Sequence, residues 1–124
     1  MMKKLLSLVV MGLCLLSFNT ASAHEAAQAR HGGVVAKAND FDFELVGTPT
    51  GALLFVADHG KPMSPAGMSG KLTVLSGSDK SEAALTVAGD KLEAKGLKLA
   101  PGAKVVAALT TPAKKAITVR FTVK

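Results

Sequence analysis

Apolar residues alternate with polar residues at two places in this chain, and this period of two constrains the fold more than any other feature. The apolar residues of 41–45 would share one face of a strand, with Asp42 and Glu44 on the other face. In 117–123, four apolar residues alternate with Thr, Arg and Thr. Both segments therefore predict strands that bury one face in a core and expose the other.

Five further segments rich in Val, Leu or Thr predict strands between these two, and a first strand is expected at 33–38. Clusters of Gly, Pro, Ser and Asp separate the segments at roughly 8 to 12 residues, a spacing typical of an antiparallel sandwich or barrel. With about seven or eight strands, the sequence predicts an all-β, immunoglobulin-like antiparallel β-sandwich. The five segments are 52–58, 71–76, 83–88, 91–97 and 104–110.

One segment, 59–70, interrupts this rhythm, because it is long for a hairpin and carries two Pro and three Gly residues. Such a loop is either a functional surface or a crossover between the two sheets of a sandwich. The crossover is the commoner explanation, and we expect it here.

The N-terminus has the pattern of a secretory signal peptide over residues 1–23. A short basic start is followed by an apolar run of 14 residues, 5–18, and then by small residues that end at Ala23. Because a transmembrane helix needs roughly 18 or more apolar residues, we expect a cleaved leader and no membrane span in the mature protein. The remaining chain predicts a flexible arm at 24–30 and one domain at 31–124.

Composition excludes several classes of function. The mature chain has no cysteine, so it has no disulfide, thiolate zinc site or cysteine nucleophile. Lys3 and Lys4 leave with the leader, so 13 of the 15 basic residues remain against 9 acidic ones, spread without a dense run. With no Tyr or Trp to stack on bases, nucleic-acid binding is not expected. No Gly-x-Ser-x-Gly motif is present, and we do not expect an enzyme.

Metal binding is the favoured chemistry, and its candidate ligands are His31, His59, His24, Met63 and Met68. Imidazole suits Cu(II), Zn(II) and Ni(II), whereas thioether sulfur selects Cu(I), so the mixture favours copper, with zinc or nickel as alternatives. If the mature protein begins at His24, its α-amine and ring nitrogen can chelate Cu(II). Either His31 or His59 would then complete a tetragonal set.

Each candidate also has a structural explanation. His24 would be the first residue of an unstructured arm. His31 would begin the first strand, with the two glycines after it permitting a bulge or a close backbone approach. His59 and Asp58 would close a turn through side-chain to backbone bonds, and one or both methionines would fill the core.

Four short motifs, HGGVV at 31–35, FELV at 43–46, FVADHGKP at 55–62 and GMSGKLTVL at 67–75, resemble a small periplasmic β-sandwich domain. That domain occurs alone or at the front of the membrane fusion adaptors of heavy-metal efflux pumps. The resemblance implies a Gram-negative periplasm, a link to heavy-metal export, and His31 as well as His59 as the polar positions carried over. The chain has no room for the coiled-coil, lipoyl and barrel domains of an adaptor, so it matches the stand-alone form.

A second likeness is to periplasmic copper-resistance carriers, which are sandwiches of similar size with a mature N-terminal His. Those carriers hold further copper ligands in a loop near the last strand, whereas 109–115 contains neither His nor Asp here. The sequence thus predicts a periplasmic protein that buffers copper or delivers it to an efflux-system protein. The alternative is a metal-free module that binds a partner protein through an exposed strand edge.

Overall fold

The computed structural model describes residues 28–124 of the chain. The expected signal peptide, His24 and the first part of the expected arm lie outside these residues. From 28 to 124 there is no helix long and apolar enough to cross a bilayer.

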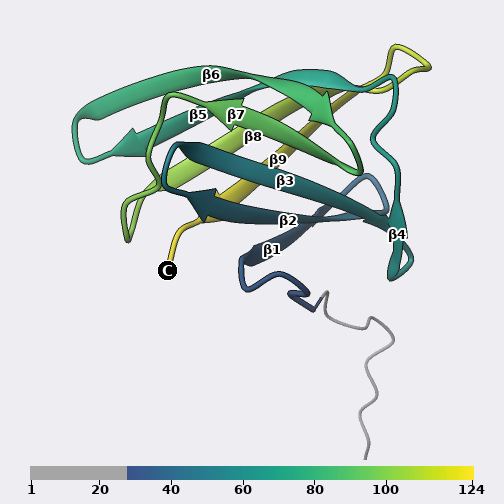
Figure 1. The fold of residues 1–124 in the computed structure, drawn as a ribbon, viewed down its shortest axis with the longest axis horizontal. Coiled ribbons are helices and arrows are strands. Elements are labelled where there is room, and N and C mark those ends of the chain that lie inside the picture. The colour runs from purple at the N-terminus through teal and green to yellow at the C-terminus, as the bar shows by residue number, and fades with distance from the viewer. Residues whose placement is uncertain (1–27) are drawn as a thin grey trace, which may run out of the picture.

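Nine strands make up the described part of the chain, and all their ladders are antiparallel, which confirms the all-β prediction (Figure 1). Eight of them overlap the expected segments, and the ninth is the three-residue β4. The strands are β1 (Val34–Ala38), β2 (Phe41–Thr48), β3 (Gly51–Asp58), β4 (Lys61–Met63), β5 (Ser69–Ser76), β6 (Asp79–Ala88), β7 (Lys91–Lys95), β8 (Lys104–Thr110) and β9 (Ala116–Thr122).

The strands follow the order β1-β2-β3-β7-β6-β5-β8-β9, with β4 added to β3. Strand β6 belongs to both layers, because residues 79–85 pair with β5 and residues 86–88 pair with β7. An immunoglobulin sandwich places strands A, B, E and D in one sheet and C, F and G in the other. Strands β2, β3, β7 and the end of β6 reproduce the first set, and β5, β8 and β9 the second. The shared β6 curls the two layers into a nearly barrel-like shape.

The segment 64–68 carries the chain from β4, on the β3 layer, to β5 in the other layer (Figure 1). This confirms the predicted crossover. Met68 lies in this segment with 6% of its surface exposed, and it packs in the core.

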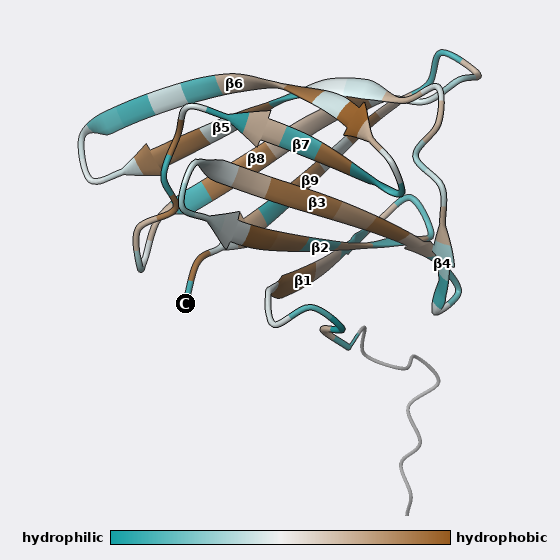
Figure 2. Ribbon diagram, in the orientation of Figure 1, coloured by the Kyte–Doolittle hydropathy of each residue, from teal (hydrophilic) through white to brown (hydrophobic). Residues whose placement is uncertain are grey.

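The core lies between the two layers and is built by the inward face of each alternating strand. Figure 2 shows that apolar residues are concentrated in strands such as β2 and β3. Burying a side chain of this kind stabilises the fold by about 1.5–3 kcal/mol. The largest fully buried apolar side chains include Phe43, Leu45, Leu54, Leu72, Leu85, Leu92 and Ile117.

Strand β2 departs from the predicted alternation at one position. The period of two placed Glu44 on the solvent face, but the structure buries it, with 6% of its surface exposed. That prediction was wrong because the backbone of residues 30–33 lies over the outer face of β2 and hydrogen-bonds to the Glu44 carboxylate. The pattern of a single strand carries no information about a segment that folds over it.

Candidate metal-binding groove

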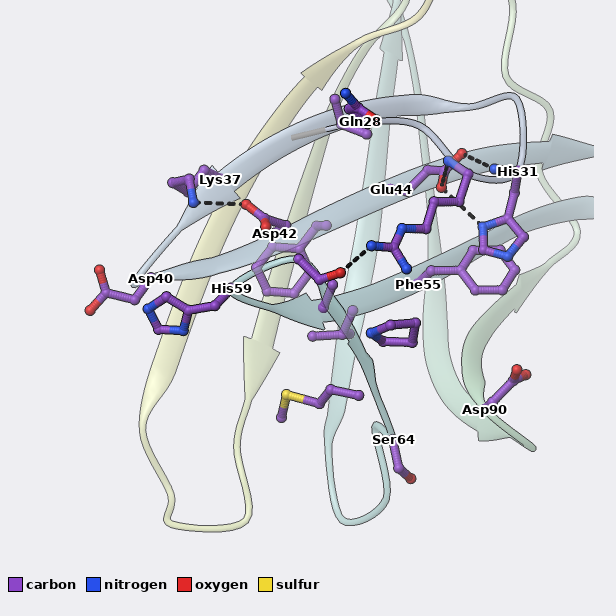
Figure 3. Close-up of a pocket in the computed structure, with 18 residues that line it drawn as sticks. Gln28, His31, Lys37, Asp40, Asp42, Glu44, Phe55, His59, Ser64 and Asp90 are labelled. Atoms are coloured by element: carbon purple, nitrogen blue, oxygen red, sulfur yellow. Dashed lines mark hydrogen bonds and ion pairs between the residues drawn. The ribbon is translucent and has the colours of Figure 1, made fainter. Parts of the chain in front are cut away.

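An open groove of about 980 Å³ lies over the outer face of β1, β2 and β3, beside the hairpin that joins β3 to β4 (Figure 3). Two of the three histidines, His31 and His59, line it together with Met63. Phe55 and Asp90 line the groove near His31 in Figure 3. The sequence analysis did not single out either residue.

The Glu44 carboxylate organises one end of the groove by accepting four hydrogen bonds. Its Oε1 accepts from the backbone N–H of Arg30 at 2.9 Å and lies 3.0 Å from Nδ1 of His31. Its Oε2 accepts from the backbone N–H groups of His31 and Gly33, each at 2.8 Å. One side chain thus fixes both the backbone and the ring of His31.

Two glycines allow the chain to approach β2 this closely. Gly32 has a φ of +77°, in the left-handed region that glycine adopts without strain. A Cβ on Gly33 would lie 2.2 Å from the carbonyl oxygen of Leu45, so only glycine fits there without displacing backbone. The close backbone approach predicted for the His31-Gly-Gly motif is therefore confirmed.

Two opposing effects set the charge of Glu44. Burial is the largest and raises the pKa of its carboxyl. The hydrogen bonds from the backbone of Arg30 and Gly33 and from the ring and backbone of His31 together outweigh burial, so the pKa lies below the ordinary 4.5. Glu44 is thus ionised at neutral pH, and a carboxylate only accepts hydrogen bonds.

His31 is held at its edge and on its face. Its ring stacks on Phe55, with the centroids 3.7 Å apart and the planes 6° from parallel. Because the Glu44 carboxylate is an acceptor, Nδ1 carries the proton of the neutral ring, which leaves the lone pair on Nε2. The side chain is 44% exposed and lines the groove, so the ring is accessible from the groove.

His59 occupies the two-residue turn between β3 and β4. Its φ is +51° and that of Gly60 is +82°, the left-handed pair that a type I′ hairpin turn requires. Its Nδ1 lies 2.5 Å from Oδ1 of Asp58, and 82% of the side chain is exposed. The predicted turn is present, although Asp58 contacts the His59 ring rather than the backbone.

Figure 3 places His31 and His59 at opposite ends of the groove. Arg30 lies next to His31 in the chain, and its guanidinium donates a hydrogen bond to the carbonyl oxygen of Gly60. Among residues 28–124 there is no group of three or more His, Cys, Asp or Glu side chains that could hold a metal ion. The two histidines therefore line one groove without forming a compact ligand set by themselves.

The remaining candidates divide into three cases. Met63 lines the groove, whereas Met68 is buried in the core and does not line it. His24 lies outside the described residues. Glu44 was the main residue that sequence reasoning missed, and an acidic residue between Phe43 and Leu45 gives no signal that separates it from an ordinary solvent-facing position.

No protein-family model matches this chain, and no curated protein or solved structure shows significant similarity to it.

Proposed function

We propose that this protein is a periplasmic metal-binding protein that takes up a copper ion at the groove, with zinc or nickel as the other ions suited to imidazole. The observation that carries this proposal is the state of His31. Glu44 and Phe55 fix its ring, and Nε2 keeps a free lone pair at the groove.

The two imidazoles make the hydrogen bond that is usual for metal-binding histidines. A metal-bound His almost always donates its other ring N–H to a carboxylate or a carbonyl, which sets the tautomer and raises the basicity of the ligating nitrogen. His31 makes this contact with Glu44, and His59 makes it with Asp58. Met63 adds a thioether, a soft ligand that favours Cu(I).

A complete Cu(II) set needs further nitrogen ligands beside His31. Gln28 lines the groove, and His24 precedes it by four residues, which span at most about 14 Å of extended chain. If the mature chain begins at His24, the chain between His24 and Gln28 is short enough to keep the α-amine and ring of His24 near the groove. We propose His24 and His31 as the principal Cu(II) ligands, whereas His59, at the opposite end of the groove, is not part of this set.

Binding fits this groove better than hydrolysis does. Ser64 lines the groove, and its Oγ accepts a hydrogen bond from the backbone N–H of Ala66 at 3.2 Å. Within residues 28–124, no hydrogen bond joins Ser64 to a histidine, and both His31 and His59 are engaged with carboxylates of their own. We therefore propose that the protein buffers copper or delivers it to an efflux-system protein and is not an enzyme.

A metal-free module that pairs with a partner through a strand edge is the alternative. In β6, residues 79–85 pair with β5 alone, which leaves one edge without a ladder in the described part of the chain. That edge carries Asp79, Lys80 and Glu82, and charged side chains are the usual protection of an edge against pairing. The edge therefore favours this alternative less than the groove favours metal binding.

Equilibrium dialysis against Cu(II) tests the proposal on protein that has been exported and processed by the cell, so that its natural N-terminus is present. We expect stoichiometric binding, a loss of at least tenfold in affinity for His31→Ala, and no change for Lys37→Gln, a groove-lining control. Weak binding that is equal in the wild type and in His31→Ala would contradict the proposal and favour the interaction module.

A further inference from the structure

Charge is unevenly distributed along this chain. After Glu93 the sequence has seven basic residues and no acidic residue up to its end. Strands β5, β8 and β9, which form one layer of the sandwich, contain no Asp or Glu. The groove on the other layer is lined by four carboxylates, those of Asp40, Asp42, Glu44 and Asp90, against the two cations of Arg30 and Lys37, so the two sides of the molecule differ in charge.

The outer face of the β6-β5-β8-β9 layer collects basic side chains because the buried residues of each strand point inward. Lys71 of β5, Lys104 of β8, Arg120 of β9 and Lys80 of β6 are all exposed, and each alternates with residues that face the core. We refer to these four residues as the basic face. In the view of Figure 1, β8 and β9 pass behind β3 and β7, whereas β6 runs along the top.

The strand register spreads these charges across the layer. Leu75 pairs with Lys80 on one side and with Lys104 on the other, and Val106 pairs with Arg120. Neighbouring strands are about 4.8 Å apart, so four strands spread the charges over about 14 Å. Small or short side chains fill much of the space between them, including Thr73, Ala84, Ala108, Thr118 and Thr122.

Of the two carboxylates on the described strands β5, β6, β8 and β9, Glu82 shares the outward positions of the basic face, whereas Asp79 has the opposite parity of the pleat. Glu82 of β6 lies 3.5 Å from both Lys71 and Lys80, and these two lysines lower the pKa of its carboxyl. Lys104 donates a hydrogen bond to Oγ1 of Thr122 at 3.2 Å and, like Arg120, makes no ion pair with a residue of 28–124. Four positive charges thus face one negative charge.

We propose that the basic face docks the protein on a membrane surface that contains anionic phospholipids. A flat array of separated cations matches a plane of many headgroups better than it matches a single anion held in a pocket. The outer positions of this layer carry no aromatic side chain and one exposed large apolar side chain, Leu75, so the contact is mainly electrostatic and leaves the groove on the opposite layer free. An oriented charge distribution of this kind also turns the molecule toward such a surface.

The strength and salt dependence of the contact follow from its electrostatic origin. Each Lys or Arg near an anionic bilayer strengthens binding about fivefold. Because exposed charges are screened over about 8–10 Å at physiological ionic strength, added salt should release the protein. The proposal rests on the basic face alone and does not depend on metal binding.

Co-sedimentation with vesicles tests this proposal on the exported, processed protein. We expect binding to vesicles of phosphatidylglycerol and phosphatidylcholine at low salt, and none to vesicles of phosphatidylcholine alone. The triple variant Lys71→Gln, Lys104→Gln and Arg120→Gln should bind at least 20-fold more weakly. Three independent fivefold losses would give about 125-fold, and 20-fold is the smallest loss that we expect.

The matched control is a second triple variant, Lys61→Gln, Lys95→Gln and Lys98→Gln, which removes three positive charges outside the basic face. Its affinity for the vesicles should be close to that of the wild type. Circular dichroism melts check that both triple variants are folded, and Arg120→Gln alone, with an expected fivefold loss, replaces the first triple if that variant is unfolded. An equal loss in the two triples would overturn the proposal. So would absence of binding to phosphatidylglycerol, which would leave an acidic protein as the partner to examine.

Discussion

The imidazole of His31 lies parallel to the ring of Phe55, with 3.7 Å between the ring centroids. Phe55 of β3 pairs in register with Glu44 of β2, so two adjacent residues of the sheet provide both contacts of the His31 ring. The face of the ring rests on one and its Nδ1 on the other. These two contacts therefore fix the orientation of a histidine that precedes the first strand.

The Glu44→Ala variant should destabilise the protein by about 1–3 kcal/mol, since it removes the acceptor of three backbone N–H groups and of the His31 ring. Chemical unfolding measures the change. Amide hydrogen exchange should become faster at Arg30, His31 and Gly33. Asp90→Ala is the control, because this carboxylate is exposed and pairs with the neighbouring Lys91, so its loss should change stability little. Equal effects of the two substitutions would argue against the proposed role of Glu44.

The metal-free protein should lose stability in acid through Glu44. The folded state lowers the pKa of this carboxyl, so its contribution is complete above the ordinary value of 4.5 and is lost as the pH falls through the lower, folded pKa. Unfolding free energies measured from neutral pH to below 4.5 should decline more steeply for the wild type than for Glu44→Gln. Parallel curves for the two proteins would contradict this assignment.

The Gly33→Ala variant should cost about 1–3 kcal/mol and weaken copper binding, because the new Cβ would meet the carbonyl oxygen of Leu45 and push His31 away from Glu44. In Gly47→Ala the new Cβ would make only ordinary contacts, of 3.5 Å or more, with Leu99. This control should change stability by less than about 0.5 kcal/mol. A thermal shift assay and a copper titration on both variants test the difference, and a neutral Gly33→Ala would refute it.

The two methionines should behave differently. Met63 lines the groove, so Met63→Leu should weaken Cu(I) binding several-fold without a large effect on folding. Met68 is buried, and Met68→Leu nearly conserves its volume, so it should cost less than about 1.5 kcal/mol and leave Cu(I) binding unchanged. Competition with a chromophoric Cu(I) chelator measures both affinities. A loss confined to Met68→Leu would contradict the assignment.

Most of the fold could be predicted from the sequence, because alternation and turn residues act over neighbouring positions. The period of two placed Phe43, Ile117 and Val119 in the core correctly, and the Pro- and Gly-rich segment 59–70 proved to contain the crossover. Strand β4 was missed, because three residues containing a proline give no strand signal.

The candidate site was less predictable, because its contacts join segments far apart in the chain. Glu44 contacts His31 across 13 residues, and Arg30 contacts Gly60 across 30. The sequence motif indicated that His31-Gly-Gly allows a close approach, but it did not identify Glu44 or Phe55 as the residues approached. Residue types therefore suggested the chemistry of the histidines, while the tertiary structure was needed to show how each is oriented.

Electron paramagnetic resonance of the Cu(II)-loaded protein, exported and processed so that it begins at its natural N-terminus, tests the central claim most directly. We predict a stoichiometric tetragonal signal with nitrogen ligands that is lost in His31→Ala and retained in His59→Ala. A signal that is identical in the wild type and in His31→Ala would show that copper binds elsewhere, and would contradict the assignment of His31 as the ligand fixed by Glu44 and Phe55.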